Sequence, residues 1–153
     1  MSALLEVEQL EVNFGGRVSA VRGASVAVER GETHCLVGES GCGKSVTALS
    51  ILRLIPPETG RIVQGSIRFE GTELTGLSER EMKSLRGHRI SMIFQEPMTS
   101  LNPVLTVGTQ IAENVVRHMN VSWSAARGRA REMLDLVGIA DARRRLDEYP
   151  HQL

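Results

Sequence analysis

The chain has 153 residues, of which 41% are hydrophobic and 24% charged, a composition typical of one globular domain rather than of a disordered chain. Its 18 basic and 18 acidic side chains give zero formal net charge, which argues against a nucleic-acid-coating domain, an acidic tail or a polybasic membrane-surface patch. Aromatic residues make up only 3% of the sequence, so a stacking platform for single-stranded nucleic acid is not expected.

The cysteines and histidines indicate neither a disulfide framework nor a metal site. Cys35 and Cys42 are the two cysteines, and their spacing fits neither a redox pair nor a zinc knuckle. The four histidines are scattered without ligand spacing. The N-terminus lacks a secretory signal, and no apolar run is long enough to span a membrane, so we expect a soluble, cytoplasmic chain.

The first third of the chain is predicted to form strands. Apolar and polar residues alternate over residues 10–14 and again over 26–28, as in half-buried antiparallel strands. Residues 34–37 are nearly all apolar and end at a glycine, which favours a strand buried on both faces and places Cys35 in the core. Apolar residues then recur at helical spacing over 46–55, and Pro56 ends that helix.

The middle of the chain contains two further β-rich runs and one short helix. Residues 66–69 are expected to form a strand between turn glycines, and residues 90–94 form another β-rich run. Ser78 followed by Glu81 is a capping-box pattern that opens a short charged helix. Residues 95–103 are predicted to be a loop because they contain two prolines.

The last third is predicted to be helical. Helices are expected over residues 106–119, 124–137 and 142–148. Gly138 is expected to end the second helix, and Asp141 is expected to cap the third.

The strongest signal is the octapeptide GESGCGKS, which matches the phosphate-binding pattern G-x-x-x-x-G-K-[ST]. Glycines let backbone N–H groups approach phosphate oxygens, and the helix that follows directs its positive end at the same point. Lys44 is expected to reach the β- and γ-phosphates, and the hydroxyl of Ser45 is expected to ligate Mg²⁺. The predicted nucleotide-binding residues are Gly38, Glu39, Ser40, Gly41, Cys42, Gly43, Lys44, Ser45 and Val46.

Cys42 has two interpretations at this stage. Its place near a helix N-terminus could lower the pKa of the thiol and make it reactive. Alternatively, it is a small loop residue with no role of its own.

Two further segments carry a resemblance to a known family. The string ISMIFQEPMTSLNP over residues 90–103 resembles the Q-loop region of ABC transporter ATP-binding subunits. Together with GESGCGKS and the terminal YPHQL, it resembles the peptide/nickel uptake branch of that family, over about residues 5–153. The resemblance implies an α/β fold: a RecA-like P-loop NTPase core with an N-terminal antiparallel β subdomain and a partial helical subdomain.

The resemblance also implies roles for particular residues. Gln95 matches the Q-loop glutamine, which senses Mg²⁺ and the γ-phosphate, so with Lys44 it is the expected catalytic residue and with Ser45 the expected metal ligand. Phe14 falls where the family stacks an aromatic ring on adenine, although a core-facing position in a strand is an equal alternative. Trp123 is either an interface anchor or a packed core residue.

The expected cofactors are ATP and Mg²⁺. The expected partners are transmembrane permease subunits and a second ATP-binding subunit, in a homo- or heterodimer, with no nucleic acid. That places the chain on the inner face of the cell membrane through the permease. The expected parts are an antiparallel β subdomain over about 1–32 and 60–76, a P-loop core over 33–55 and 77–103, and the start of a helical subdomain over 104–153.

The chain departs from the family pattern at its C-terminus. The Ser-Gly-Gly signature is expected directly after Leu153, and nothing in the sequence resembles the Walker B strand or the switch histidine. We therefore expect the N-terminal portion of a longer ATPase, with the C-terminal part of the domain missing and no hydrolysis by the isolated chain. Strands 33–38 and 89–94 are then expected to expose unpaired apolar edges. The alternatives are a nucleotide-binding module without hydrolysis and a non-transport ABC-type ATPase.

Overall fold

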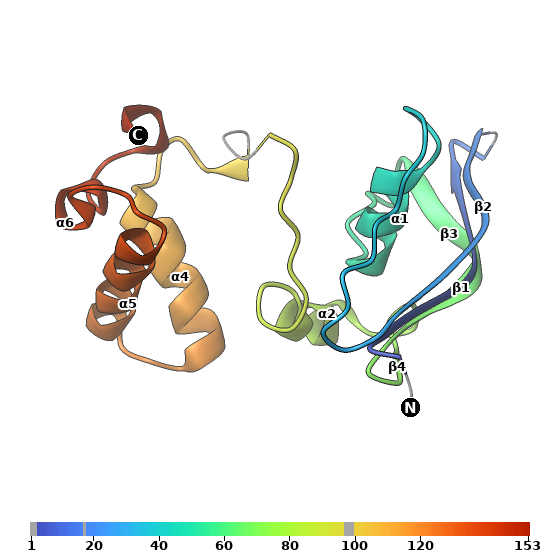
Figure 1. Cartoon of the computed structure of the whole chain (residues 1–153), viewed down its shortest axis with the longest axis horizontal. Coiled ribbons are helices and arrows are strands. Elements are labelled where there is room, and N and C mark those ends of the chain that lie inside the picture. Colours follow the sequence, from blue (N-terminus) through green and yellow to red (C-terminus); the bar gives the residue numbers. More distant parts are fainter. Residues whose placement is uncertain (1–2, 17, 97–99) are drawn as a thin grey trace. The chain divides into compact units, whose positions relative to one another are not determined.

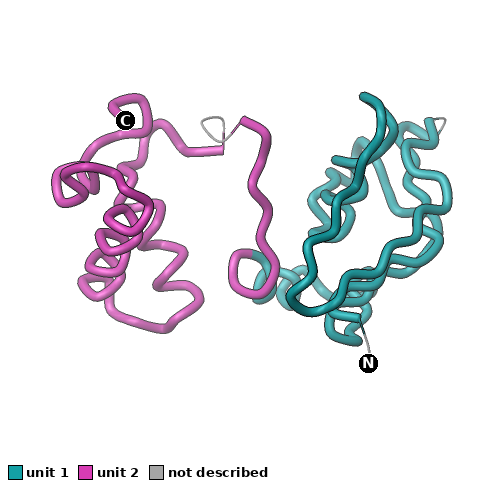
Figure 2. The backbone as a smooth tube through the Cα atoms, in the orientation of Figure 1, with its two compact units in different colours: residues 1–86 teal, residues 87–153 magenta. Residues whose placement is uncertain are grey.

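The computed structural model describes residues 3–16, 18–96 and 100–153, and the chain divides into two compact units, residues 1–86 and 87–153 (Figures 1 and 2). Each unit has its own secondary structure and is described separately. Pro97 of the predicted loop lies outside the described residues. The finer division into three parts stays a prediction.

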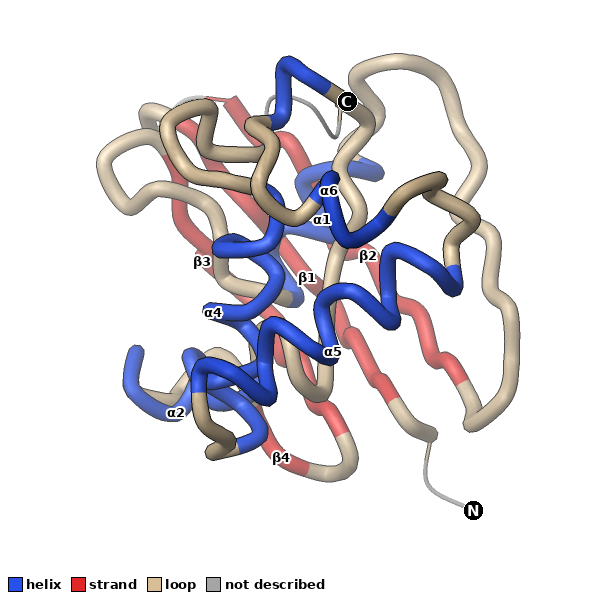
Figure 3. The backbone as a smooth tube through the Cα atoms, turned by 90° about the vertical axis from the view of Figure 1, so that its left-hand side faces the viewer, coloured by secondary structure: helices blue, strands red, loops and turns tan. Residues whose placement is uncertain are grey.

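The first unit is built on an antiparallel sheet of four strands, drawn in red in Figure 3. The strands are β1 (Leu5–Phe14), β2 (Val18–Val28), β3 (Gly60–Phe69) and β4 (Thr72–Glu73). Their order is β2-β1-β3-β4, so β1 has a hydrogen-bonded neighbour on each side. The predicted antiparallel strands are confirmed, and the predicted strand at 66–69 is the end of the longer β3.

A bulge in the middle of β1 sets which side chains face the core. Val7 and Leu10 are both buried although they lie three residues apart, because the register shifts between them. Gln9 takes a left-handed φ of 47° at this point, and its N–H donates to the hydroxyl of Ser25 at 2.9 Å. Opposite it, Gly65 has a φ of 97°, and a Cβ there would lie 2.6 Å from the Gln9 carbonyl oxygen. Only glycine fits that position.

Two helices complete the first unit, α1 (Lys44–Ile51) and α2 (Glu79–Leu85). The predicted capping box is confirmed: the Ser78 hydroxyl accepts from the Glu81 N–H at 3.3 Å, and the Glu81 carboxylate accepts from the Ser78 N–H at 2.7 Å. The buried apolar side chains come from the sheet, from the end of α1, from the turn after β4 and from α2. They include Val7, Leu10, Val12, Val21, Leu52, Ile67, Leu74 and Met82.

The two apolar runs expected to be core strands are not strands in the structure. Residues 32–39 have no regular secondary structure, and Val37 is 88% exposed. In the second run, Ile90 forms a single bridge, and the side chain of Ile93 is 92% exposed. Within the described residues neither run has a ladder partner, and a strand is stable only where neighbours satisfy its N–H and C=O groups. Because neither run is a strand, the unpaired strand edges expected from the sequence are not formed, although Leu36, Val37 and Ile93 are exposed. The core position of Cys35 is wrong, since this thiol is exposed.

The second unit is helical and contains α4 (Val107–Met119), α5 (Trp123–Leu136), α6 (Ala142–Arg145) and the 3₁₀ turn η1 (Pro150–Gln152). The first two helices match their predicted ranges closely, whereas α6 is shorter than expected. Gly138 has a φ of 77° just beyond α5, which confirms it as a C-terminal stop. Asp141 occupies the N-cap of α6, as predicted, although its φ is 55° and its side chain makes no cap hydrogen bond.

The core of the second unit lies where α4, α5 and α6 meet. Its buried residues are Val107, Ala130, Leu134, Ala142 and Leu146. Gly108 permits the close approach, because its N–H donates to the Leu146 carbonyl at 2.9 Å and a Cβ there would lie 2.6 Å from the same oxygen. None of the helices in the described part of the chain combines the length and apolarity that a bilayer crossing requires.

Candidate nucleotide-binding site

The glycine-rich loop joins the unpaired segment 32–39 to the start of α1. Beside it lies a cavity of about 510 Å³, whose walls are the loop, the first turn of α1 and β2. From the loop, Gly41, Cys42, Gly43 and Lys44 line this cavity, and Ala20 and Arg22 line it from β2. The loop therefore faces a cavity large enough for a small ligand.

Two glycines of the loop are required by its shape. Gly43 has a φ of 95°, and a Cβ there would lie 2.5 Å from the Ala20 carbonyl oxygen of β2. At Gly38 a Cβ would lie 2.6 Å from the Cys42 sulfur, across the loop. Glycine at these positions keeps the loop curled and its main chain uncovered, as a cradle for phosphate oxygens needs.

The N-terminus of α1 opens directly from this loop. Gly43 is its N-cap and offers no side-chain acceptor, and the first turn contains no acidic residue. The Gly43 carbonyl accepts from the N–H and the hydroxyl of Thr47, at 2.8 and 3.0 Å. The N–H groups of the first turn have no acceptor within the helix, and the helix dipole makes this end positive. Both features suit an anion.

Lys44 holds a positive charge within the loop. Its Nζ donates to the carbonyl oxygens of Gly38 and Glu39, each at 2.6 Å, and lies 3.4 Å from the Cys42 sulfur. These three partners use the three donors of the ammonium group. The contact with sulfur is the weakest, because sulfur is a poor acceptor. An incoming phosphate oxygen can therefore replace it at the least cost.

The remaining predicted loop residues are accessible. Glu39, Ser40 and Cys42 are exposed, and the exposed Ser45 lies in the first turn of α1. Val46 is half-buried one position further along the same helix. The structure thus brings the predicted phosphate-binding residues of 38–46 together at one loop.

The two predicted site residues outside the loop are placed differently. Phe14 ends β1 and lies against Gly60, where a Cβ would be 2.8 Å from the phenylalanine ring. It does not line the cavity beside the loop. Gln95 is exposed and belongs to the second unit. Its role stays a prediction.

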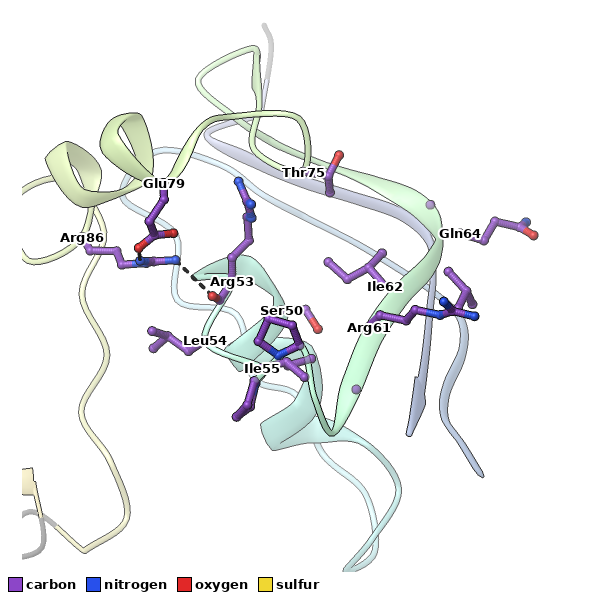
Figure 4. Close-up of a pocket in the computed structure, with 15 residues that line it drawn as sticks. Ser50, Arg53, Leu54, Ile55, Arg61, Ile62, Gln64, Thr75, Glu79 and Arg86 are labelled. Atoms are coloured by element: carbon purple, nitrogen blue, oxygen red, sulfur yellow. Dashed lines mark hydrogen bonds and ion pairs between the residues drawn. The ribbon is translucent and has the colours of Figure 1, made fainter. Parts of the chain in front are cut away.

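A larger cavity, of about 880 Å³, lies between the end of α1, β3 and α2 (Figure 4). Three arginines line it, and the guanidinium groups of Arg53 and Arg86 already have partners in the protein. Arg86 donates to the carbonyls of Leu52 and Arg53 at 2.7 and 3.0 Å and pairs with Glu79, and Arg53 donates to the Leu77 carbonyl. These arginines join the elements around the cavity, so the glycine-rich loop remains the candidate site.

One contact in the second unit was not foreseen from the sequence. The rings of His88 and His118 meet edge to face, with centroids 5.6 Å apart. Burial, helped by the neighbouring His88 and Arg117, holds the pKa of His118 below its ordinary value. Thirty residues separate the two histidines, so no local spacing could have indicated the contact.

An antiparallel sheet, a glycine-rich loop opening a helix and a helical unit are parts of the fold of an ATP-binding cassette, and solved structures confirm this fold. The dimeric MJ0796 cassette, described as a bacterial ABC transporter cassette, matches with a TM-score of 0.80 at 21% identity over 97% of this chain and 62% of that one. The cbiO1 protein of Clostridium perfringens, described as part of the ABC transporter complex cbiONQ, matches with a TM-score of 0.72 at 22% identity over 100% of this chain and 56% of that one.

A family model described as ABC transporter matches residues 21–153, and the chain belongs to this family. The dipeptide transport ATP-binding protein DppD of Bacillus subtilis is 52% identical over 99% of this chain and 46% of its own length. The probable peptide ABC transporter ATP-binding protein y4tR of Sinorhizobium fredii is 56% identical over 98% of this chain and 46% of its own length. The resemblance to the peptide branch is confirmed, and the chain spans about half the length of these relatives.

Proposed function

We propose that this chain is the nucleotide-binding portion of the ATP-binding subunit of an ABC importer, and that residues 38–46 hold the phosphates of ATP·Mg²⁺. The observation that carries the proposal is the curled loop. Gly38 and Gly43 admit no side chain, the Lys44 ammonium is held inside the loop, and the loop opens an uncapped helix. These groups fit a polyphosphate, which needs several converging donors and a balancing positive charge.

Different groups of this chain are proposed to bind different parts of ATP·Mg²⁺. Backbone N–H groups of the loop and the first turn of α1 orient the phosphate chain, and Lys44 neutralises part of its charge. The hydroxyl of Ser45 and the amide oxygen of Gln95 are the proposed Mg²⁺ ligands. When bound, Mg²⁺ would offset part of the negative charge of the phosphates.

For the full-length protein we propose ATP hydrolysis coupled to the uptake of peptides or a related small solute. Relatives of this chain are described as dipeptide and oligopeptide transport ATP-binding proteins, which supports that substrate class. The proposed partners are permease subunits and a second ATP-binding subunit, which would place the protein at the cytoplasmic face of the membrane.

Lysine substitution tests the phosphate site directly, because the chain contains only two lysines, Lys44 and Lys83. Lys44→Ala is expected to weaken binding of a fluorescent ATP analogue with Mg²⁺ about tenfold to a hundredfold, since a charge-assisted hydrogen bond to phosphate contributes about 1.5–3 kcal/mol. Titration of the purified chain by fluorescence anisotropy measures this change.

Lys83→Ala is the matched control, because Lys83 is an exposed lysine in the last turn of α2. It is expected to leave the affinity unchanged. Equal affinity of wild type and Lys44→Ala would remove Lys44 from the site, and equal losses in both variants would show only a general effect of charge.

A further inference from the structure

Two histidines of the second unit lie side by side although they are far apart in the chain. His88 belongs to the turn 87–90, which the Gly87 N–H closes by donating to the Ile90 carbonyl at 2.9 Å. His118 lies in the last turn of α4. Their ring centroids are 5.6 Å apart, and the two ring planes are nearly perpendicular, at 85°. The fold thus brings two imidazole rings from separate segments to one place.

A third polar side chain reaches the same turn. Asn114 precedes His118 by four residues, so the two side chains lie on one face of α4. A Cβ added at Gly87 would lie 3.3 Å from the Asn114 Oδ1 and 3.4 Å from the His118 Nε2. The φ of Gly87 is 79°, which disfavours any side chain, so the space beside these two atoms stays open. An amide oxygen and an imidazole nitrogen of α4 therefore lie against the turn that carries His88.

The separation of the two rings suits one shared metal ion. Two imidazoles on one tetrahedral Zn²⁺, each with a Zn–N bond of about 2.0–2.1 Å, have ring centroids roughly 5–5.5 Å apart. The observed 5.6 Å requires little adjustment, because the side chain of His88 is exposed and free to rotate. Asn114 is exposed as well, so an ion can reach these groups from solvent.

The ligand types select a transition-metal ion over Mg²⁺ or Ca²⁺. Imidazole suits Zn²⁺, Cu²⁺ and Ni²⁺, whereas Mg²⁺ and Ca²⁺ prefer carboxylates and other oxygen ligands. Among the described residues, no group of three histidine, cysteine, aspartate or glutamate side chains is placed to hold a metal, and this cluster offers two histidines and an amide instead. Arg117 is exposed beside His118 and repels a cation, so binding depends on the metal–nitrogen bonds rather than on charge.

We propose that His88, Asn114 and His118 form a binding site for a divalent transition-metal ion such as Zn²⁺. One nitrogen of each ring and the Asn114 amide oxygen supply three ligands, and water completes the tetrahedron. A bound ion joins the turn 87–90 to the end of α4, and it stabilises the folded chain because the unfolded chain does not hold these groups together. The proposal is independent of nucleotide binding.

Titration of a cysteine-free chain with Zn²⁺ tests this site. Cys35→Ser and Cys42→Ser are present in every sample, because exposed thiols also bind Zn²⁺. Competition with a fluorescent zinc indicator, without nucleotide, is expected to show one ion per chain that an excess of Mg²⁺ does not displace. His88→Gln and His118→Gln are each expected to weaken Zn²⁺ binding at least tenfold, since even the loss of an outer-shell partner typically has that effect. Circular dichroism confirms that each variant is folded.

Asn114 offers a substitution that is expected to strengthen binding. Asn114→Asp replaces the amide oxygen with a carboxylate, which adds negative charge to the ligand set, and is expected to raise the affinity for Zn²⁺ at least tenfold. Asn114→Leu is expected to lower the affinity. Partial unfolding cannot produce a gain in affinity, so the pair of variants separates a metal ligand from a merely structural residue.

His34→Gln and His151→Gln are the matched controls, because they remove the two remaining histidines, both of which are exposed. Both are expected to bind Zn²⁺ as the cysteine-free chain does. The proposal is overturned if the cysteine-free chain does not bind Zn²⁺, if Mg²⁺ displaces the ion, or if the controls lose the same affinity. It is also overturned if only one of His88 and His118 matters, or if neither Asn114 variant changes the affinity.

Discussion

β1 and the segment 34–37 of the first unit both carry apolar side chains that were expected to be buried, but only those of β1 are buried in the structure. In β1 the side chains of Val7, Leu10 and Val12 are almost completely buried. In the segment, the side chains of Leu36 and Val37 are exposed, and the backbone has no regular secondary structure. Apolar character is therefore not what separates them.

The difference lies in the backbone neighbours. β1 is paired along its length with β2 on one side and β3 on the other, so its polar groups are satisfied and its inward face can be covered. Within the described residues, the segment 34–37 has no such neighbours. An apolar run in a sequence thus indicates a tendency to be buried, and burial requires partners that come from elsewhere in the chain.

The largest expected effect comes from truncating the paired strand. Leu10→Ala removes a side chain with no exposed surface and is expected to lower the free energy of unfolding by about 3 kcal/mol, because the cavity cannot collapse fully. Urea denaturation followed by circular dichroism measures this loss.

The matched substitution in the segment is Val37→Ser. Because Val37 is already in solvent, the free energy of unfolding is expected to change by less than about 0.5 kcal/mol, and aggregation is expected to decrease. If Val37→Ser destabilised the chain as strongly as Leu10→Ala, the segment would be buried in solution and the contrast with β1 would not hold.

The bulge that gives β1 its buried face offers a second test. Gly65→Ala places a Cβ 2.6 Å from backbone oxygens of β1 and strains a φ of 97°, so it is expected to cost more than about 2 kcal/mol. Gly71→Ala is the control: its φ of 77° adds strain, but a Cβ there meets open space, and a cost of about 1 kcal/mol is expected. Equal costs in urea denaturation would show that the Gly65 contact with β1 is not essential.

The sequence was most informative where structure is decided locally. The capping box at Ser78, the stop at Gly138 and the ranges of α4 and α5 depend on neighbours a few residues away, and the structure confirms them. The glycine-rich loop belongs to this class in part, because Gly38 meets Cys42 within the loop, whereas Gly43 is required by its contact with Ala20 of β2. The loop was the one part of the candidate site that the sequence predicted with its geometry.

The features that could not be predicted from the sequence depend on contacts between residues far apart in the chain. The bulge at Gln9 arises from its fit to Gly65 across the sheet, and the contact of His88 with His118 joins residues far apart in the chain. The exposure of Trp123 and of the segment 34–37 likewise depends on which elements pack beside them. No periodicity within a short window contains that information.

The smallest expected effect is on the pH dependence of stability, and it comes from the Glu73 carboxylate at the end of the sheet. The Glu73 carboxylate accepts from the Ile67 N–H at 3.0 Å and from the Thr75 hydroxyl and N–H at 2.6 and 3.2 Å. Burial alone would raise the pKa of Glu73, but these hydrogen bonds, with a smaller contribution from Arg68, hold it below the ordinary value of 4.5. The ionised carboxylate therefore ties β4 and the turn after it to β3.

Because the pKa of Glu73 is lower in the folded chain than in the unfolded one, its contribution to stability is complete above pH 4.5 and is lost as the pH falls through the folded value. Glu73→Gln cannot ionise, so it is expected to flatten the decline in stability between neutral and acidic pH. Thr75→Val keeps the carboxylate but removes one hydrogen bond, and a smaller decline than in wild type is expected. Thermal melts at a series of pH values measure the decline in stability of both variants. A decline in Glu73→Gln equal to that of wild type would mean that this carboxylate does not hold the edge of the sheet.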